Sequence, residues 1–162
     1  MTRLAPVAAV LMVSAAPLSA QAPVPADPAL VMAGVASCVA ATAGGTLDRA
    51  TVEAEGWALG RVFGENGEDL PNTLQMRSRP GSSVLMTTPV GEDVCMLVSR
   101  VEDEPAVAAI RSRMLETYPG EPQNMGEAGD VWPSGNHLLS FAWSGQVDAP
   151  SVRIIVKPKG AN

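Results

Sequence analysis

Hydrophobic periodicity changes at Trp57, and this change sets the order of secondary structure along the chain. Before Trp57, apolar residues recur every three or four positions, which is the spacing of one helix face. After it the period falls towards two, which is typical of strands, until a further helical stretch follows Glu102. Helices, then strands, a helix and a hairpin predict an α+β fold, an antiparallel sheet with N-terminal helices and one mid-chain helix packed on it.

Start and stop signals place three helices. Asp27 is the predicted N-cap of a helix over 28–41, which has proline in its first position. A shorter helix over 47–55 should end at Gly56, which readily adopts the left-handed conformation. A third helix opens on acidic residues and covers about 102–118. Its predicted buried stripe is Val107, Ile110, Met114 and Tyr118, and Arg111, Arg113 and Glu116 are predicted to face water.

About five to six strands are expected, separated by turns rich in glycine and proline. Residues 119–130, which also contain glycine and proline, predict a loop. In the last hairpin, alternate side chains of the first strand share one face, namely His137, Leu139, Phe141 and Trp143. The predicted strands lie near 57–63, 73–79, 83–88, 94–101, 137–143 and 151–157.

Residues 1–22 have the parts of a removable signal peptide: a basic start at Arg3, an uncharged stretch over 4–18 and small residues before the cleavage point. The stretch is shorter than the roughly 20 strongly apolar residues of a stable membrane span. We therefore expect export to the periplasm or the medium. Residues 23–27 predict a stiff, solvated Pro/Ala lead-in, and 28–162 a single α+β domain.

The exported part of the chain is acidic. Without Arg3, ten bases remain against seventeen acids, so the formal charge moves from −6 to −7. Binding to nucleic acid requires clustered Lys and Arg, so nucleic acid is not an expected partner. The same excess of acids argues against binding to anionic lipid headgroups.

Cys38 and Cys95 are the only two cysteines, and both lie in apolar patterns, one on a predicted helix and one on a predicted strand. In an oxidising compartment such a pair usually forms a disulfide, which is the prediction here. The alternative is two separately buried thiols that act as small apolar groups. The lack of a Cys-x-x-Cys motif argues against a thioredoxin-like oxidoreductase.

Motifs that carry catalysis or bind cofactors are sparse. The one histidine, His137, is suited to a hydrolase-like reaction with Ser134 or Ser140 and with Asp130 as the orienting group. Its position at a strand start beside aromatic residues favours a structural role instead. One histidine and two distant cysteines do not make a zinc site, and no phosphate-binding loop is present. We predict no metal and no cofactor.

The hairpin over 83–99 is apolar on both faces, which favours binding. Centring its turn on Gly91 places Met86 opposite Met96. One face then meets the helices, and the other is covered by the chain's own loops and helix or by a partner. That partner would be an envelope protein, a small apolar ligand or a homodimer mate. The candidate binding face is Val84, Met86, Val94, Met96 and Val98, and the opposite face is Leu85, Cys95 and Leu97.

Several short segments carry a resemblance: Ala36-Ser37-Cys38-Val39, Glu55-Gly56-Trp57, Asp93-Val94-Cys95-Met96-Leu97-Val98, Trp143, and Ser151-Val152-Arg153-Ile154. Together they resemble small exported proteins of GC-rich Gram-negative bacteria, a two-cysteine α+β domain of unknown function. The resemblance spans most of the exported part and carries over no catalytic residue. We therefore predict an exported, non-enzymatic binding or interaction module, and the alternative is a hydrolase-like enzyme using His137.

Overall fold

The computed structural model describes residues 24–160, so the predicted signal peptide over 1–22 lies outside the described residues. The helices are α1 (Pro28–Thr42), α2 (Arg49–Ala54) and α3 (Glu104–Thr117), with a short 3-10 helix η1 (Gly126–Ala128). The strands are β1 (Ala58–Leu59), β2 (Val62–Phe63), β3 (Asp69–Leu70), β4 (Met76–Ser78), β5 (Leu85–Thr87), β6 (Cys95–Arg100), β7 (Gln123–Asn124), β8 (Asp130–Ser134), β9 (His137–Trp143) and β10 (Ser151–Pro158).

Eight strands form one antiparallel sheet in the order β1-β4-β5-β6-β10-β9-β8-β7, and β2 and β3 form a separate two-stranded sheet. The α+β class and the antiparallel sheet are confirmed, whereas the predicted count of five to six strands is wrong. The missed strands of the large sheet, β7 and β8, lie in and just after the segment predicted as a loop. β7 has only two polar residues and β8 contains Pro133, so neither carries a clear alternating pattern.

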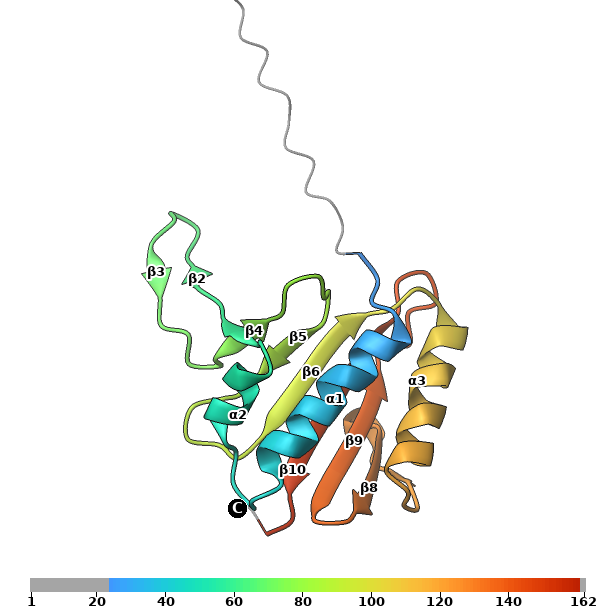
Figure 1. The fold of residues 1–162 in the computed structure, drawn as a ribbon. Coiled ribbons are helices and arrows are strands. Elements are labelled where there is room, and N and C mark those ends of the chain that lie inside the picture. The colour runs from blue at the N-terminus through green and yellow to red at the C-terminus, as the bar shows by residue number, and fades with distance from the viewer. Residues whose placement is uncertain (1–23, 161–162) are drawn as a thin grey trace, which may run out of the picture.

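Helices α1 and α3 lie on the same side of the large sheet, and α1 crosses β6 and β10 (Figure 1). α2 and α3 both contact α1. The core therefore forms between the helices and one sheet face, and the other sheet face carries neither α1 nor α3. The fully buried residues of the core include Val31, Val35, Ile110 and Met114 from the helices and Leu97, Trp132, Leu139, Ile154 and Val156 from the strands.

The helices begin at capping aspartates. The side chains of Asp27, Asp48 and Asp103 each accept a hydrogen bond from a backbone N–H in the first turn of α1, α2 and α3. Hydrogen bonds from the Thr51 hydroxyl and the Ala50 N–H lower the pKa of Asp48 below its ordinary value. The predicted N-cap of α1, Asp27, is confirmed, whereas the cap of α3 by Asp103 is seen only in the structure.

Trp57 joins the helices to the sheet. Gly56 before it has φ of 86°, the left-handed conformation that was predicted for this position. The Trp57 indole donates from Nε1 to the Ser37 hydroxyl oxygen on α1 at 3.1 Å, and Ser37 in turn donates to the Glu55 carboxylate. Because its polar atom has a partner, the large Trp57 side chain is buried at 1% exposure.

The lead-in is attached to the sheet. The Ala26 N–H donates to the Arg100 carbonyl at the end of β6 at 2.8 Å, and Ala26 is 3% exposed. Val24 and Pro25 are exposed. The predicted solvation of the lead-in is therefore wrong for Ala26, because its backbone N–H bonds to the end of a strand.

The β5–β6 hairpin has a register one residue away from the predicted one. Met86 pairs with Leu97, and not with Met96. The Thr88 N–H at the end of β5 donates to the Leu74 carbonyl, which extends the pairing of β5 with the β4 side beyond the last residues of the two strands. A slip of one residue turns side chains to the opposite face of a sheet, so this difference changes which residues are buried.

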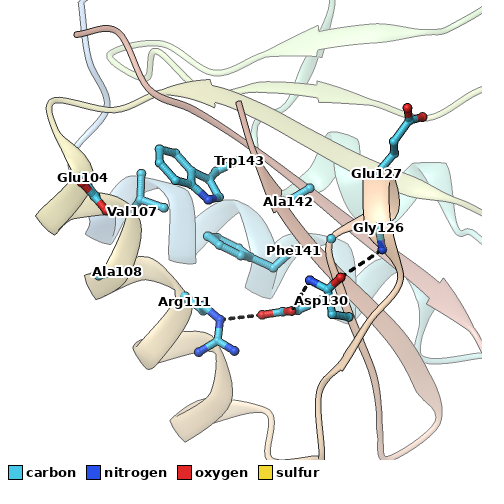
Figure 2. Close-up of a pocket in the computed structure, with 12 residues that line it drawn as sticks. Glu104, Val107, Ala108, Arg111, Gly126, Glu127, Asp130, Phe141, Ala142 and Trp143 are labelled. Atoms are coloured by element: carbon cyan, nitrogen blue, oxygen red, sulfur yellow. Dashed lines mark hydrogen bonds and ion pairs between the residues drawn. The ribbon is translucent and has the colours of Figure 1, made fainter. Parts of the chain in front are cut away.

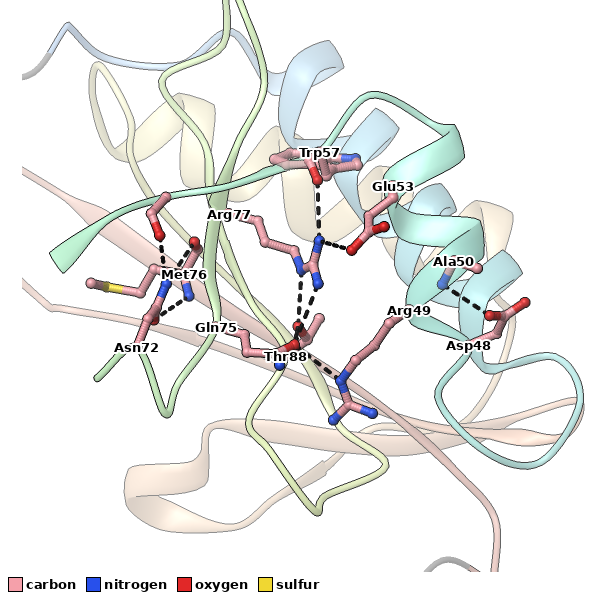
Figure 3. A network of polar contacts seen from close by, with 11 residues as sticks. Asp48, Arg49, Ala50, Glu53, Trp57, Asn72, Gln75, Met76, Arg77 and Thr88 are labelled. Atoms are coloured by element: carbon pink, nitrogen blue, oxygen red, sulfur yellow. Dashed lines mark hydrogen bonds and ion pairs between the residues drawn. The ribbon is translucent and has the colours of Figure 1, made fainter. Parts of the chain in front are cut away.

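Arg77 is a buried cation where α2 meets the short strands (Figure 3). Its side chain is 2% exposed. The guanidinium donates to the Trp57 carbonyl at 3.3 Å and the Glu53 carboxylate at 3.1 Å. It also donates to the Thr88 hydroxyl oxygen at 3.2 Å and the Gln75 amide oxygen at 3.3 Å. These bonds compensate the cost of burying the charge.

Replacing Arg77 with methionine is expected to lower the free energy of unfolding by about 2 kcal/mol, because the buried Trp57 carbonyl and Thr88 hydroxyl lose their donor. The matched control is Arg61→Met, which removes an arginine whose side chain and whose partner, Asp69, are both more than half exposed. That change should cost at most about 0.5 kcal/mol. Urea denaturation measures both, and equal losses would contradict the prediction.

Candidate functional site

Cys38 on α1 and Cys95 on β6 form a disulfide, which confirms the predicted pair. Their Cα atoms are 5.5 Å apart although the residues lie 57 positions apart in the sequence. The contact of α1 with β6 brings them together, and both are fully buried. The bond fastens the helical layer to the sheet, and its burial indicates a structural role.

The residues of the predicted binding face do not lie on one side of the sheet. Val84 and Met86 are buried in the core, at 2% and 0% exposure. The shifted register turns these two towards the helices and leaves other members of the hairpin on the opposite side. The side without α1 and α3 carries Leu85, Met96 and Val98, and Val94 is half-buried just before β6.

His137 begins β9, and Ser134 at the end of β8 pairs with it in register. The other groups predicted for a hydrolase have different partners. The Ser140 hydroxyl donates to a backbone carbonyl of η1 at 2.8 Å, and the Asp130 carboxylate accepts from Arg111 at 2.7 Å. In the described part of the chain no side-chain hydrogen bond joins His137 to these groups, and its buried Nε2 has no partner.

A cleft of about 430 Å³ lies between α3 and the strands β8 and β9 (Figure 2). One wall is a single face of α3, because its members are spaced three and four residues apart. The second wall is the end of β9 over 141–143, and the segment 124–130 with η1 forms the third. The residues of the α3 wall are Glu104, Val107, Ala108 and Arg111.

An ion pair spans one end of the cleft (Figure 2). Arg111 Nε donates to Asp130 Oδ2 at 2.7 Å, and Asn124 Nδ2 lies 3.4 Å from Asp130 Oδ1. The Arg111 side chain is 41% exposed and that of Asp130 is 20% exposed. Among the described residues the terminal nitrogens of Arg111 make no hydrogen bond, so Asp130 orients an arginine that can still donate to a ligand.

Trp143 is the aromatic wall of the cleft. It ends β9 opposite Val152 and is 40% exposed, whereas Phe141 two residues earlier is 3% exposed. The other two tryptophans of the chain, Trp57 and Trp132, are buried at 1% and 0%. Trp143 therefore presents a large apolar surface to the cleft and to solvent at the same time.

Sequence reasoning did not find this site. It correctly places Trp143 and Phe141 on one face of β9, as their pairing with β10 confirms. Arg111 was expected only to face water, and its partner Asp130 lies on a strand that the sequence did not predict. The sequence did contain one usable signal, namely Trp143. It is a large aromatic residue at the end of a strand, where fewer core residues are available to cover it.

No group of three or more potential metal ligands comes together within residues 24–160. In the same range no helix is long and apolar enough to cross a membrane. Comparison with protein-family models, with curated proteins and with solved structures finds no match to this chain. The resemblance to small exported two-cysteine proteins therefore stays a prediction.

Proposed function

We propose that this chain is an exported, non-enzymatic domain that binds a ligand in the cleft between α3 and β9. The observation that carries the proposal is the 40% exposure of Trp143 at a cleft, in a chain whose other tryptophans are buried. Exposed aromatic side chains beside a concave surface are frequent anchors for ligands. Ser140 and Asp130 bond to other groups, and no side-chain hydrogen bond joins either of them to His137 among the described residues, so no second function is put forward.

Location in the periplasm or the medium is part of the proposal. The Cys38–Cys95 disulfide supports it, because disulfides persist in oxidising compartments and are rare in the cytosol. The signal-like sequence over 1–22 supports it independently. Fractionation of the producing cell tests this part, and a full-length chain with free thiols in the cytosol would contradict it.

The walls of the cleft favour a ligand with an apolar group and a polar end. Trp143 and Val107 offer apolar surface, with Phe141 behind them. Arg111, held through Nε by Asp130, offers donors at its terminal nitrogens. A small amphipathic molecule fits this arrangement, as does a side chain of an envelope protein that combines an apolar body with acceptor atoms.

The probe anilinonaphthalene sulfonate combines an aromatic body with an anionic acceptor, and it is expected to bind the cleft at one saturable site. Trp143→Ala should weaken this binding about tenfold, because the aromatic wall is lost. The emission of the probe measures the effect.

Trp143→Phe is the matched control, since it keeps an aromatic ring at the same position and should retain most of the affinity. Equal binding by the wild type and Trp143→Ala would show that the probe binds elsewhere, and would count against the cleft as the ligand site.

A further inference from the structure

The sheet side without α1 and α3 carries a second surface, which we call the open sheet face. It is defined by Leu85, Met96, Val98, Arg100, Arg153, Ile155 and Lys157. The cross-strand pairs Leu85–Val98, Val98–Arg153 and Met96–Ile155 place these residues on the same side. Leu85 is 36% exposed, and the apolar side chains of Met96, Val98 and Ile155 are half-buried.

The open sheet face is basic, although the chain as a whole is acidic. Arg100, Arg153 and Lys157 lie on it, and the strands β5, β6, β9 and β10 contain no acidic residue. An acid from another element, Glu127 on η1, lies beside this face, and its backbone carbonyl accepts a hydrogen bond from Arg153. Glu127 and Arg153 line a hollow of about 340 Å³ at the rim of this face.

A second feature projects from the body of the molecule: the arm, residues 61–70, which contains β2 and β3 (Figure 1). Its sheet consists of the two pairs Val62–Leu70 and Phe63–Asp69. Phe63 is 56% exposed and Leu70 is 43% exposed. A two-stranded hairpin is marginally stable by itself, so an arm with its apolar side chains in water gains by being covered.

The arm is acidic where the open sheet face is basic. It carries Glu65, Glu68 and Asp69 against the single base Arg61. Arg61 pairs with Asp69 and lies over the Phe63 ring at 5.2 Å, so this base is already engaged within the arm. The Glu68 carboxylate accepts a hydrogen bond from the Asn66 N–H, but no base of the arm pairs with Glu65 or Glu68, so both charges are open to an outside partner.

We infer that the arm of one copy of this chain lies on the open sheet face of a second copy, and that two copies exchange arms. Each chain supplies an apolar, acidic projection and an apolar, basic face, so the two surfaces are complementary in both properties. In a reciprocal exchange about a two-fold axis, each arm is covered by the face of the other copy. No arm or face is then left to bind a third chain, so the assembly stops at two chains. The rim of the open sheet face adjoins the cleft, because Glu127 and Trp143 line both the hollow and the cleft, but the inference does not rest on a ligand in the cleft.

The first test is the mass of the exported protein in solution, measured by light scattering over a concentration series. The expected result is twice the chain mass, falling to the chain mass on dilution. Phe63→Ser should raise the dissociation constant about tenfold, because it removes an exposed apolar anchor without touching the core. The matched control, Val147→Ser, changes another exposed apolar residue outside both surfaces and should have no effect.

The second test reverses charge on one surface at a time. The arm variant Glu65→Lys/Glu68→Lys has a basic arm and a basic face, and the face variant Arg153→Glu/Lys157→Glu has an acidic arm and an acidic face. Each should be monomeric alone, because like charges meet in both contacts. An equal mixture of the two should form heterodimers, because each arm then meets a face of opposite charge.

Two outcomes would overturn the inference. One is a wild-type protein that is a monomer at every concentration. This outcome also covers the case in which the arm binds a different protein and not a second copy of this chain. The other is a dimer whose dissociation constant is unchanged by Phe63→Ser and by both charge reversals, since its interface would then lie elsewhere.

Discussion

Removing the disulfide is expected to lower the free energy of unfolding by about 4 kcal/mol. The bond joins residues 57 positions apart, so it restricts the unfolded chain strongly, while in the folded state it only connects α1 and β6 where they already pack together. For a domain of this length the loss corresponds to a fall in the melting temperature on the order of 15 °C. Urea denaturation of the oxidised and the reduced protein measures it directly.

The double variant Cys38→Ala/Cys95→Ala separates the cross-link from the chemistry of the sulfur atoms. It should unfold near the reduced wild type, apart from the small loss of packing at two buried sites, and a reducing agent should have no further effect on it. Coincident unfolding curves for the oxidised and reduced wild type would contradict the predicted contribution of the bond.

Gly129→Ala is expected to lower the free energy of unfolding by about 3 kcal/mol or more. Gly129 has φ of 77° and ψ of −149°, a conformation open essentially only to glycine. A Cβ atom there would lie 2.8 Å from Ala142 Cα and closer still to the Phe141 carbonyl oxygen. Since both neighbours are backbone of β9, they cannot move aside without disturbing the sheet.

Gly135→Ala is the matched control, because Gly135 also has a positive φ, 53°, but a Cβ there would meet no atom within 4 Å. It should cost about 1 kcal/mol, the conformational penalty alone. Thermal unfolding of both variants measures the difference.

Gly129→Ala should also weaken probe binding in the cleft, because Gly129 precedes Asp130 and forms part of the cleft wall. Equal stability of the two variants would refute the close-contact argument.

The elements that the sequence predicted well depend on neighbours a few residues apart. The predicted cap Asp27 marks the start of α1 because its side chain bonds to backbone of the same turn, and acids such as Glu104 mark the start of α3 because they face the positive end of the helix dipole. Of the predicted stripe, Val107, Ile110 and Met114 are buried, since helical spacing puts these residues on one face, whereas Tyr118 is half-buried at the C-cap.

The elements that the sequence did not predict depend on contacts between distant segments. β7 and β8 become strands by pairing with one another and with β9, and the pairing of β5 with β6 is one residue away from the register that a turn centred on Gly91 predicts. No local pattern encodes these bonds, and a single shifted register moved Val84 and Met86 from a predicted surface into the core.

By itself the sequence determined the α+β class, the places where helices begin, and the pairing of Cys38 with Cys95, which follows from there being two cysteines and an expected oxidising compartment. Only the tertiary structure decided which sheet face is open and where Trp143 and the Arg111–Asp130 pair form a cleft. The physical reason is that periodicity and capping act within a few residues, whereas a cleft exists only after separate elements have packed and fixed one another's register.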